Sequence, residues 1–252
     1  MTTLGTRLVA STALSIGLAA GTAFGQDLPG GMVGLQTQGQ SFNWVAGQDG
    51  NLEWTEDGYA FSGNDSGSGW IVQWDILASG ASTEFITASF TIINTGASAA
   101  AFEISAMDMI LGDYSTGSLV GGSVAGSYTD FNGNGVTVGS IDGGSIYSAI
   151  VDSDTIDPLD GTVVGTLLTA TSGSASSFLS GTFASESFGG VPAIPGASGP
   201  PVFENIGMNL AFELSAGDSA TFTASMAIAT PAPGAMALLA ITGIHGRRRR
   251  TE

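Results

Sequence analysis

The chain has 252 residues, a formal net charge of −17 at pH 7 and no cysteine. Residues 26–230 contain all but one of the 22 acidic residues. The same stretch contains no lysine and no arginine. Such a surface repels phosphates, so the composition excludes nucleic acid and anionic lipid as partners of the body. The lack of cysteine excludes disulfides and thiolate chemistry. With 43% hydrophobic residues, the chain can still bury the core of one large domain.

The first 25 residues have the pattern of a secretory signal peptide. A single base, Arg7, precedes an apolar stretch over residues 8–24, and the small residues Ala23 and Gly25 fit the positions that signal peptidase reads. We predict cleavage just before Gln26 and therefore a secreted mature protein. An N-terminal membrane anchor is the alternative, which the high content of small and polar residues disfavours.

Alternation of apolar and polar residues predicts β-strands throughout residues 26–230. The clearest runs come in two pairs, 84–94 with 101–110 and 206–214 with 220–228, each joined by a short turn of small or polar residues. We expect each pair to form a β-hairpin with one buried face. Further strands are predicted at 69–77, 136–141, 145–151, 162–169 and 177–184.

No helical period is sustained in this body, so the predicted fold class is all-β. Many short strands separated by Gly, Ser, Asn and Asp favour an antiparallel β-sandwich or jelly-roll-like domain, which we place at residues 26–230 as a single unit. The proline-rich stretch 189–201 cannot form a central strand, because proline has no N–H for the ladder, and it is predicted to be a surface loop.

All four tryptophans fall in one part of the chain, at Trp44, Trp54, Trp70 and Trp74. Exposed on a sheet, their rings could stack on sugars, and the domain would then be a carbohydrate-binding module. Trp70 and Trp74 are four residues apart and hence on the same face of a predicted strand. The usual place of such residues is the core, which we favour over sugar binding.

The sequence DFNGNG resembles the first half of an EF-hand calcium loop. Asp130, Asn132 and Asn134 supply oxygen atoms at alternate positions, and a glycine follows at the position of the sharp turn. The second half fails, because Ile141 stands where a bidentate glutamate is needed and Asp142 comes one residue late. Two interpretations stay open: a simple Asn-Gly turn, or a turn that also binds calcium through Asp130, Asn132, Asn134 and Asp142. Calcium is the only cofactor that the sequence suggests.

Four acids also crowd into the loop DSDTIDPLDG, at Asp152, Asp154, Asp157 and Asp160. Like charges at this spacing repel one another unless they are solvated or bridged by a cation. A solvated loop is the simpler interpretation, and a cation site is the alternative.

Enzymatic activity is not expected. A nucleophilic triad needs a base, and the only histidine, His245, lies in the C-terminal tail. A carboxylate glycosidase is the less favoured alternative, because it requires two acids roughly 5 to 9.5 Å apart in an open cleft.

Residues 231–252 consist of three parts in a fixed order. A Pro/Gly breaker is followed by an apolar run over residues 235–244 and then by a cluster of arginines. Arginines behind an apolar segment stay on the cytoplasmic side of a membrane, so we predict a short C-terminal hydrophobic helix that anchors the protein transiently. A buried core helix is the alternative, since residues 235–246 span only about 18 Å against a bilayer core of about 30 Å.

This tail resembles the PEP-CTERM sorting signal of Gram-negative and related bacteria, in a variant with alanine in place of the central glutamate. The residues that carry the resemblance are Pro231, Ala232, Pro233, Gly234, Arg247, Arg248, Arg249 and Arg250. The resemblance implies processing by an exosortase-type enzyme and delivery to the outer surface or extracellular matrix of a bacterium. We therefore expect a non-enzymatic structural or adhesive protein, with extracellular polysaccharide as a candidate partner.

Overall fold

The computed structural model describes residues 30–56, 58–80, 83–156, 159–190 and 195–231. The predicted signal peptide, its cleavage site and all of the sorting tail except Pro231 lie outside the described residues. Within the described residues the only helix is a three-residue 3-10 turn, η1 (Ile141–Gly143), and no helix there is long and apolar enough to cross a membrane.

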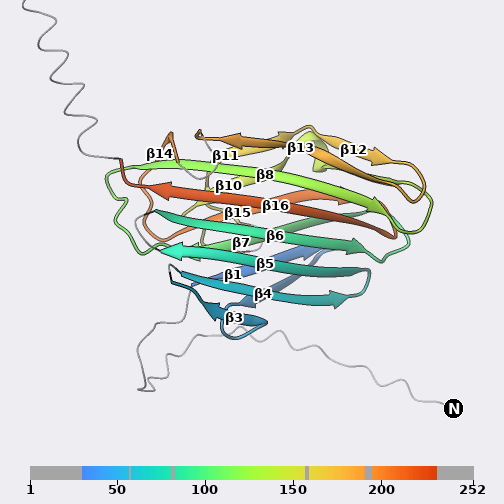
Figure 1. Cartoon of the computed structure of the whole chain (residues 1–252), viewed down its shortest axis with the longest axis horizontal. Helices are drawn as coiled ribbons and strands as arrows, with labels where there is room; N and C mark the ends of the chain where they lie inside the picture. Colours follow the sequence, from blue (N-terminus) through green and yellow to red (C-terminus); the bar gives the residue numbers. More distant parts are fainter. Residues whose placement is uncertain (1–29, 57, 81–82, 157–158, 191–194, 232–252) are drawn as a thin grey trace, which may run out of the picture.

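The described chain forms two antiparallel β-sheets, as the fold-class prediction required (Figure 1). Sheet 1 has the order β11 (Thr162–Thr169), β10 (Ser145–Val151), β15 (Asn205–Leu214), β7 (Ala100–Met109), β1 (Met32–Thr37) and β2 (Gln40–Val45), with β9 (Val136–Ser140) pairing both β15 and β12 (Ser172–Ala175). Sheet 2 has the order β13 (Ser180–Phe188), β8 (Ser118–Asp130), β16 (Asp218–Ala229), β6 (Glu84–Asn94), β5 (Trp70–Gly80), β4 (Gly58–Gly67) and β3 (Asn51–Trp54), with β14 (Ala197–Gly199) pairing β8.

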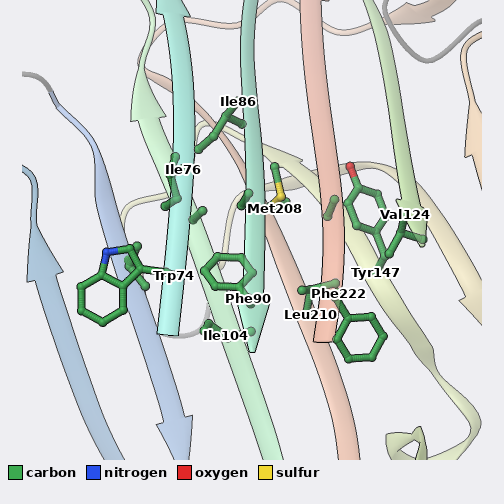
Figure 2. Close-up of a cluster of buried hydrophobic side chains, with 14 of the residues drawn as sticks. Trp74, Ile76, Ile86, Phe90, Ile104, Val124, Tyr147, Met208, Leu210 and Phe222 are labelled. Atoms are coloured by element: carbon green, nitrogen blue, oxygen red, sulfur yellow. The ribbon is translucent and has the colours of Figure 1, made fainter. Parts of the chain in front are cut away.

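The two sheets enclose one main hydrophobic core. Along β6 every second side chain is buried, which is the pattern of a strand with one face on the core and one face toward solvent. Figure 2 shows Phe90 and Phe222 of sheet 2 beside Ile104 and Leu210 of sheet 1. Large apolar side chains from both sheets thus interdigitate, as in other β-sandwiches.

Neither predicted hairpin exists. Strands β6 and β7 belong to different sheets, and so do β15 and β16. Instead, β16 pairs with β6 over ten residues, and β15 pairs with β7 over ten residues. Alternation of apolar and polar residues indicates only that one face of a strand is buried. The same pattern occurs in the two strands of a hairpin and in two strands that face each other across a core. Each short connection therefore crosses from one sheet to the other.

The longest strand, β8, was missed by the sequence analysis because its glycines and serines blur the alternation. Gly122 and Gly126 in this strand lie directly against aromatic rings, and a Cβ at Gly126 would clash with Phe222 and Phe183. The small residues of β8 therefore provide space for rings contributed by neighbouring strands.

Both ends of the described chain lie at the same end of the sandwich, which we call the proximal end. The start of β1 is paired with Met107 and the end of β16 with Leu119. The opposite end, on the right in Figure 1, we call the distal end. Its loops are residues 38–39, 68–69, 95–99, 131–135, 176–179 and 215–217.

Candidate functional site

The six distal loops contain no charged side chain. The loops at the proximal end, by contrast, contain several carboxylates, among them Asp113, Asp152, Asp154, Asp160 and Glu204. The proximal loops are therefore acidic, whereas the six distal loops contribute no charge of their own. Because no lysine or arginine occurs in the described chain, no ion pair offsets this asymmetry.

Asp130 joins two of the distal loops. Its buried carboxylate accepts hydrogen bonds from the backbone N–H groups of Asn132 and Gly133 at Oδ1, over 3.1 and 2.8 Å. Its Oδ2 accepts from the N–H groups of Gly135 and Phe178, over 3.0 and 2.7 Å. Burial acts to raise the pKa of Asp130, but the four N–H groups together outweigh it and hold the pKa below its usual range. The anion thus fixes loop 131–135 against loop 176–179.

Asp218 lies beside Asp130, paired with it in register across β8 and β16. It is fully buried, and its Oδ2 accepts a hydrogen bond from the hydroxyl of Ser215. Burial raises the pKa of Asp218, and the neighbouring Asp130 raises it further. Its Oδ1 has no hydrogen-bond partner as an acceptor. The two neighbouring carboxyls therefore differ, because backbone N–H groups stabilise the charged form of Asp130 whereas burial disfavours the charged form of Asp218.

Three large apolar side chains stand out from this pair of loops, and we call them the distal tip. Phe131, Phe178 and Leu179 are 57%, 71% and 57% exposed. The backbone N–H of Asp130 donates to the carbonyl of Leu179, which holds the three residues close together. Phe178 has a φ of 57°, which is uncommon for a bulky residue. The loop therefore holds an exposed aromatic ring in place at some conformational cost.

The four predicted calcium ligands are not brought together. The oxygens of Asp130 are occupied by four N–H groups, and the side chain of Asn132 accepts from the N–H of Asn134 and donates to the carbonyl of Ala216. Asp142 follows the far end of β9, a five-residue strand that spans about 16 Å at about 3.3 Å per residue. Among the described residues, no three acidic or histidine side chains converge on a common point. The loop therefore has the geometry of the simple turn.

Three of the four tryptophans are core residues. Trp44, Trp70 and Trp74 are buried, and the rings of Trp44 and Trp74 stack with centroids 4.7 Å apart. The indole N–H of Trp44 donates to Asp65 over 3.0 Å. Only Trp54, on the edge strand β3, is substantially exposed, at 46%. The favoured core interpretation is therefore confirmed for three of the four rings, and the alternative, a four-ring surface for sugar stacking, is not formed because strand alternation turns those three rings inward.

A polar hollow lies on the same part of sheet 2. It has a volume of about 590 Å³ and is open to solvent beside the first residue of β3. Outward-facing side chains of β4, β5 and β6 line it, and the buried residue Trp74 also forms part of the lining. The side chains that reach it from the solvent face are Ser62, Asn64, Gln73, Asp75, Ser89 and Thr91.

Two acids of the loop DSDTIDPLDG, Asp152 and Asp160, accept hydrogen bonds from backbone N–H groups. Asp152 Oδ1 accepts from the N–H groups of Phe203 and Glu204, both over 2.8 Å. Asp160 Oδ1 accepts from the hydroxyl of Ser153, over 2.9 Å, and from two N–H groups. The Ser153 hydroxyl is the main cause of a lowered pKa at Asp160. Asp154 is exposed, and Asp157 lies outside the described residues.

A second pair of carboxyls, Glu84 and Asp108, was not predicted. Buried Glu84 accepts from the N–H groups of Leu111 and Gly112, and Tyr59 donates its hydroxyl to Asp108 over 2.9 Å. Burial raises the pKa of Asp108 to about 6, and the charge of Glu84 adds to the shift. The two acids lie on strands of different sheets, β6 and β7, so no local sequence pattern marks them.

No protein-family model matches the chain, and no curated protein or solved structure matches it either. Any function must therefore be inferred from the residues of the chain and their arrangement.

Proposed function

We propose that this protein is a non-enzymatic structural or adhesive protein of the bacterial surface or extracellular matrix, sorted by an exosortase-type system. The observation that carries the proposal is the order of the C-terminal tail, in which a Pro-Ala-Pro-Gly breaker, an apolar run and four consecutive arginines follow directly on the last strand. Together with the N-terminal segment, this order fits export followed by a transient stop in the membrane.

The position of the chain ends supports this proposal. β16 ends at the proximal end, so a tail held in a membrane leaves the distal loops pointing away from that membrane. The acidic proximal loops and the neutral distal loops would then have different surroundings. A surface protein needs such an outward-facing part to make contact with its environment.

The sorting proposal is tested by replacing Arg247, Arg248, Arg249 and Arg250 with serine in the full chain and fractionating cells of a bacterium that has an exosortase. We expect the variant to be retained unprocessed in the cell envelope, whereas the wild-type chain is trimmed at its C-terminus and reaches the surface or medium. The control is Glu252→Ser, which changes a charged residue of the tail and leaves the arginines intact. Identical processing of all three chains would contradict the proposal.

A second candidate function is binding of neutral polysaccharide, and the polar hollow on sheet 2 is the observation that favours it. Its volume of about 590 Å³ lies within the range of ligand sites. Amide and hydroxyl side chains there offer both hydrogen-bond donors and acceptors. Asp75 is the single charged group of the lining and no base lies nearby, which fits an uncharged sugar better than an acidic one.

This second candidate is tested on a glycan array with the wild-type chain, Asn64→Ala and Gln73→Ala. We expect both variants to weaken binding of any neutral glycan that the wild type retains, because each removes a donor and an acceptor from the hollow. Trp54→Ala serves as a comparison, since it removes the exposed ring outside the hollow. Absence of binding to every glycan, or a loss caused by Trp54→Ala alone, would overturn the hollow as the site.

A further inference from the structure

Three exposed apolar side chains lie together at the proximal end, and we call them the proximal patch. Met109, Leu111 and Phe203 are 46%, 79% and 67% exposed. β7 and β15 run antiparallel, and just beyond their paired residues the backbone N–H of Ile110 donates to the carbonyl of Glu204 over 3.0 Å. Because antiparallel pairing sets residues opposite one another, Leu111 lies across from Phe203.

The proximal patch continues a small apolar cluster outside the main core. Met107, on the face of β7 turned away from that core, is buried together with Ile150, Ile156 and Leu159. Ile156 and Leu159 belong to the loop that follows β10, and this loop covers Met107 but leaves Met109 half exposed. The described chain therefore covers only part of this apolar surface, and an exposed remainder of this kind marks a contact site.

The last strand ends close to the proximal patch. Ile228 on β16 pairs with Glu84 on β6, and the carboxylate of Glu84 accepts a hydrogen bond from the backbone N–H of Leu111 over 2.9 Å. Two short contacts thus connect the end of β16 to the patch. The apolar run 235–244 of the tail begins six residues after the end of β16, a reach of about 20 Å in extended chain. The run can therefore reach the patch along its whole length.

The same reach argues against the distal tip as the place where the run binds. β16 has 12 residues and spans about 40 Å at about 3.3 Å per residue. The distal tip lies at the start of this strand, beside the pair Asp130 and Asp218. Only the last few residues of the apolar run could reach it, and only from a fully extended tail. The two exposed apolar clusters thus differ in their distance from the tail.

Charge complementarity also favours the tail as the segment that covers the patch. The carboxylate of Asp152 accepts from the N–H of Phe203, Glu204 follows directly, and Asp113 lies in the loop after β7. The described chain has no lysine or arginine, so a second copy of the body would bring only like charges to this acidic border. The tail carries four consecutive arginines, at residues 247–250, directly behind its apolar run.

We propose that the proximal patch is the docking surface for the C-terminal tail of the same chain. The apolar run 235–244 covers Met109, Leu111 and Phe203, and the arginines lie against the acidic proximal loops. Because the tail is joined to β16, the contact is intramolecular and needs no high protein concentration.

The docked tail has a consequence that rests on the proposed function. A tail that is docked cannot at the same time be inserted in a membrane. Docking would therefore shield the apolar run from water until a membrane takes it up, and removal of the tail would leave the proximal patch free for another contact.

Docking is tested with pairs of spin labels in the purified chain from residue 26 onward, in buffer without lipid or detergent. The absence of native cysteine allows specific labelling. Thr251→Cys labels the tail behind the arginines, and it is combined with Thr116→Cys in an exposed proximal loop or with Ser176→Cys in an exposed distal loop. We expect one narrow, short distance for the proximal pair and a much longer distance for the distal pair. Dilution with unlabelled chain should leave both distances unchanged.

The test variant combines Leu111→Ser with Phe203→Ser. We expect it to lower the equilibrium constant for docking at least about tenfold, and so to replace the narrow distance by a broad distribution. The matched control combines Phe131→Ser with Leu179→Ser, which removes two distal side chains that are each 57% exposed, and it should keep the narrow distance.

A second variant, with serine at residues 247–250, leaves the body unchanged and should also broaden the distribution, as should about 0.5 M sodium chloride. A broad distribution in the wild type, or a narrow one that the Leu111→Ser and Phe203→Ser variant retains, would overturn the proposal. An equal effect of the distal control, or a short distance that disappears on dilution with unlabelled chain, would overturn it as well. No exosortase is present in this experiment, so a failure of the sorting proposal would be recognised separately.

Discussion

Carboxylates in the described part of this protein are stabilised by backbone N–H groups and hydroxyls instead of by basic side chains. Asp130 has four N–H partners, Asp152 has two, and Glu84 has two. Hydrogen bonds from several N–H groups can stabilise a carboxylate as effectively as a nearby cation. These acids therefore fix loops, and their number does not by itself indicate binding of metal.

Replacement of Asp130 by asparagine should be strongly destabilising. The amide NH₂ would face N–H donors that need an acceptor, and leaving two buried donors without partners costs roughly 2–4 kcal/mol. Asp142→Asn is the matched control, because Asp142 is exposed at a φ of 50°, where asparagine is tolerated. Urea unfolding at pH 7 measures both free energies of unfolding. Equal effects of the two substitutions would contradict the role assigned to Asp130.

Asp108 should make the protein less stable as the pH rises through about 6. Its folded-state pKa is above the unfolded value of about 3.9, so the folded state binds more protons between these two values. The contribution of Asp108 to the free energy of unfolding is then highest below pH 4. It falls by up to about 3 kcal/mol as the pH rises past 6. Burial is the main cause, because it disfavours the charged form.

Asp108→Asn removes this dependence while keeping an acceptor for the hydroxyl of Tyr59. We expect the variant to be more stable than wild type at pH 8, by roughly 1–3 kcal/mol, with about half of that difference at pH 5 and little of it below pH 4. Asp154→Asn removes the same charge at an exposed proximal position and controls for net charge. Urea unfolding at several pH values between 5 and 8 gives the comparison, and parallel curves for wild type and Asp108→Asn would rule out the effect.

At the scale of elements, β16 is an interior strand of sheet 2, hydrogen-bonded to β8 on one side and to β6 on the other. Phe222 on its inner face is fully buried, and its ring centroid lies 4.9 Å from that of Phe212 in sheet 1. The outward neighbour Thr223 is exposed. One strand thus offers a core position and a surface position side by side.

Phe222→Ala should lower the free energy of unfolding by about 3–5 kcal/mol, because it removes buried contacts and leaves a cavity between the sheets. Thr223→Ala should change it by less than about 1 kcal/mol. Thermal or urea unfolding distinguishes the two. A small effect of Phe222→Ala would mean that the sheets do not pack on each other at this point.

The strands that could be predicted include the shorter runs 136–141, 145–151 and 162–169, which correspond to β9, β10 and β11, as well as those with long, regular alternation. The runs 84–94, 206–214 and 220–228 correspond closely to β6, β15 and β16. Strand β8 was not predicted, because its glycines accommodate rings from other strands and interrupt the alternation. Strands β1 to β4 were not predicted, because their alternation is short or interrupted. Pairing was predicted wrongly for both supposed hairpins, because alternation does not distinguish a hydrogen-bonded neighbour from a strand across the core.

At the scale of the whole molecule, the uniform negative charge opposes the compact state. Raising the concentration of sodium chloride from low to about 0.5 M should raise the melting temperature by a few degrees, since screening weakens the repulsion among the carboxylates. At equal ionic strength, calcium and EDTA should give the same melting temperature, because Asp130 and Asp142 lie at opposite ends of β9. A specific shift with calcium would restore the predicted calcium site.

The sequence by itself determined the fold class, the positions of the regular strands and the absence of basic partners for the acids, because composition and alternation are local properties of the chain. Only the tertiary structure decided which strands pair, that Asp130 binds the N–H of Phe178, and that Glu84 approaches Asp108. Those contacts join segments far apart in the sequence, and they form because both sheets must bury their apolar faces at once. The separation of uncharged distal loops from acidic proximal loops arises in the same way, from where the folded strands place their connecting loops.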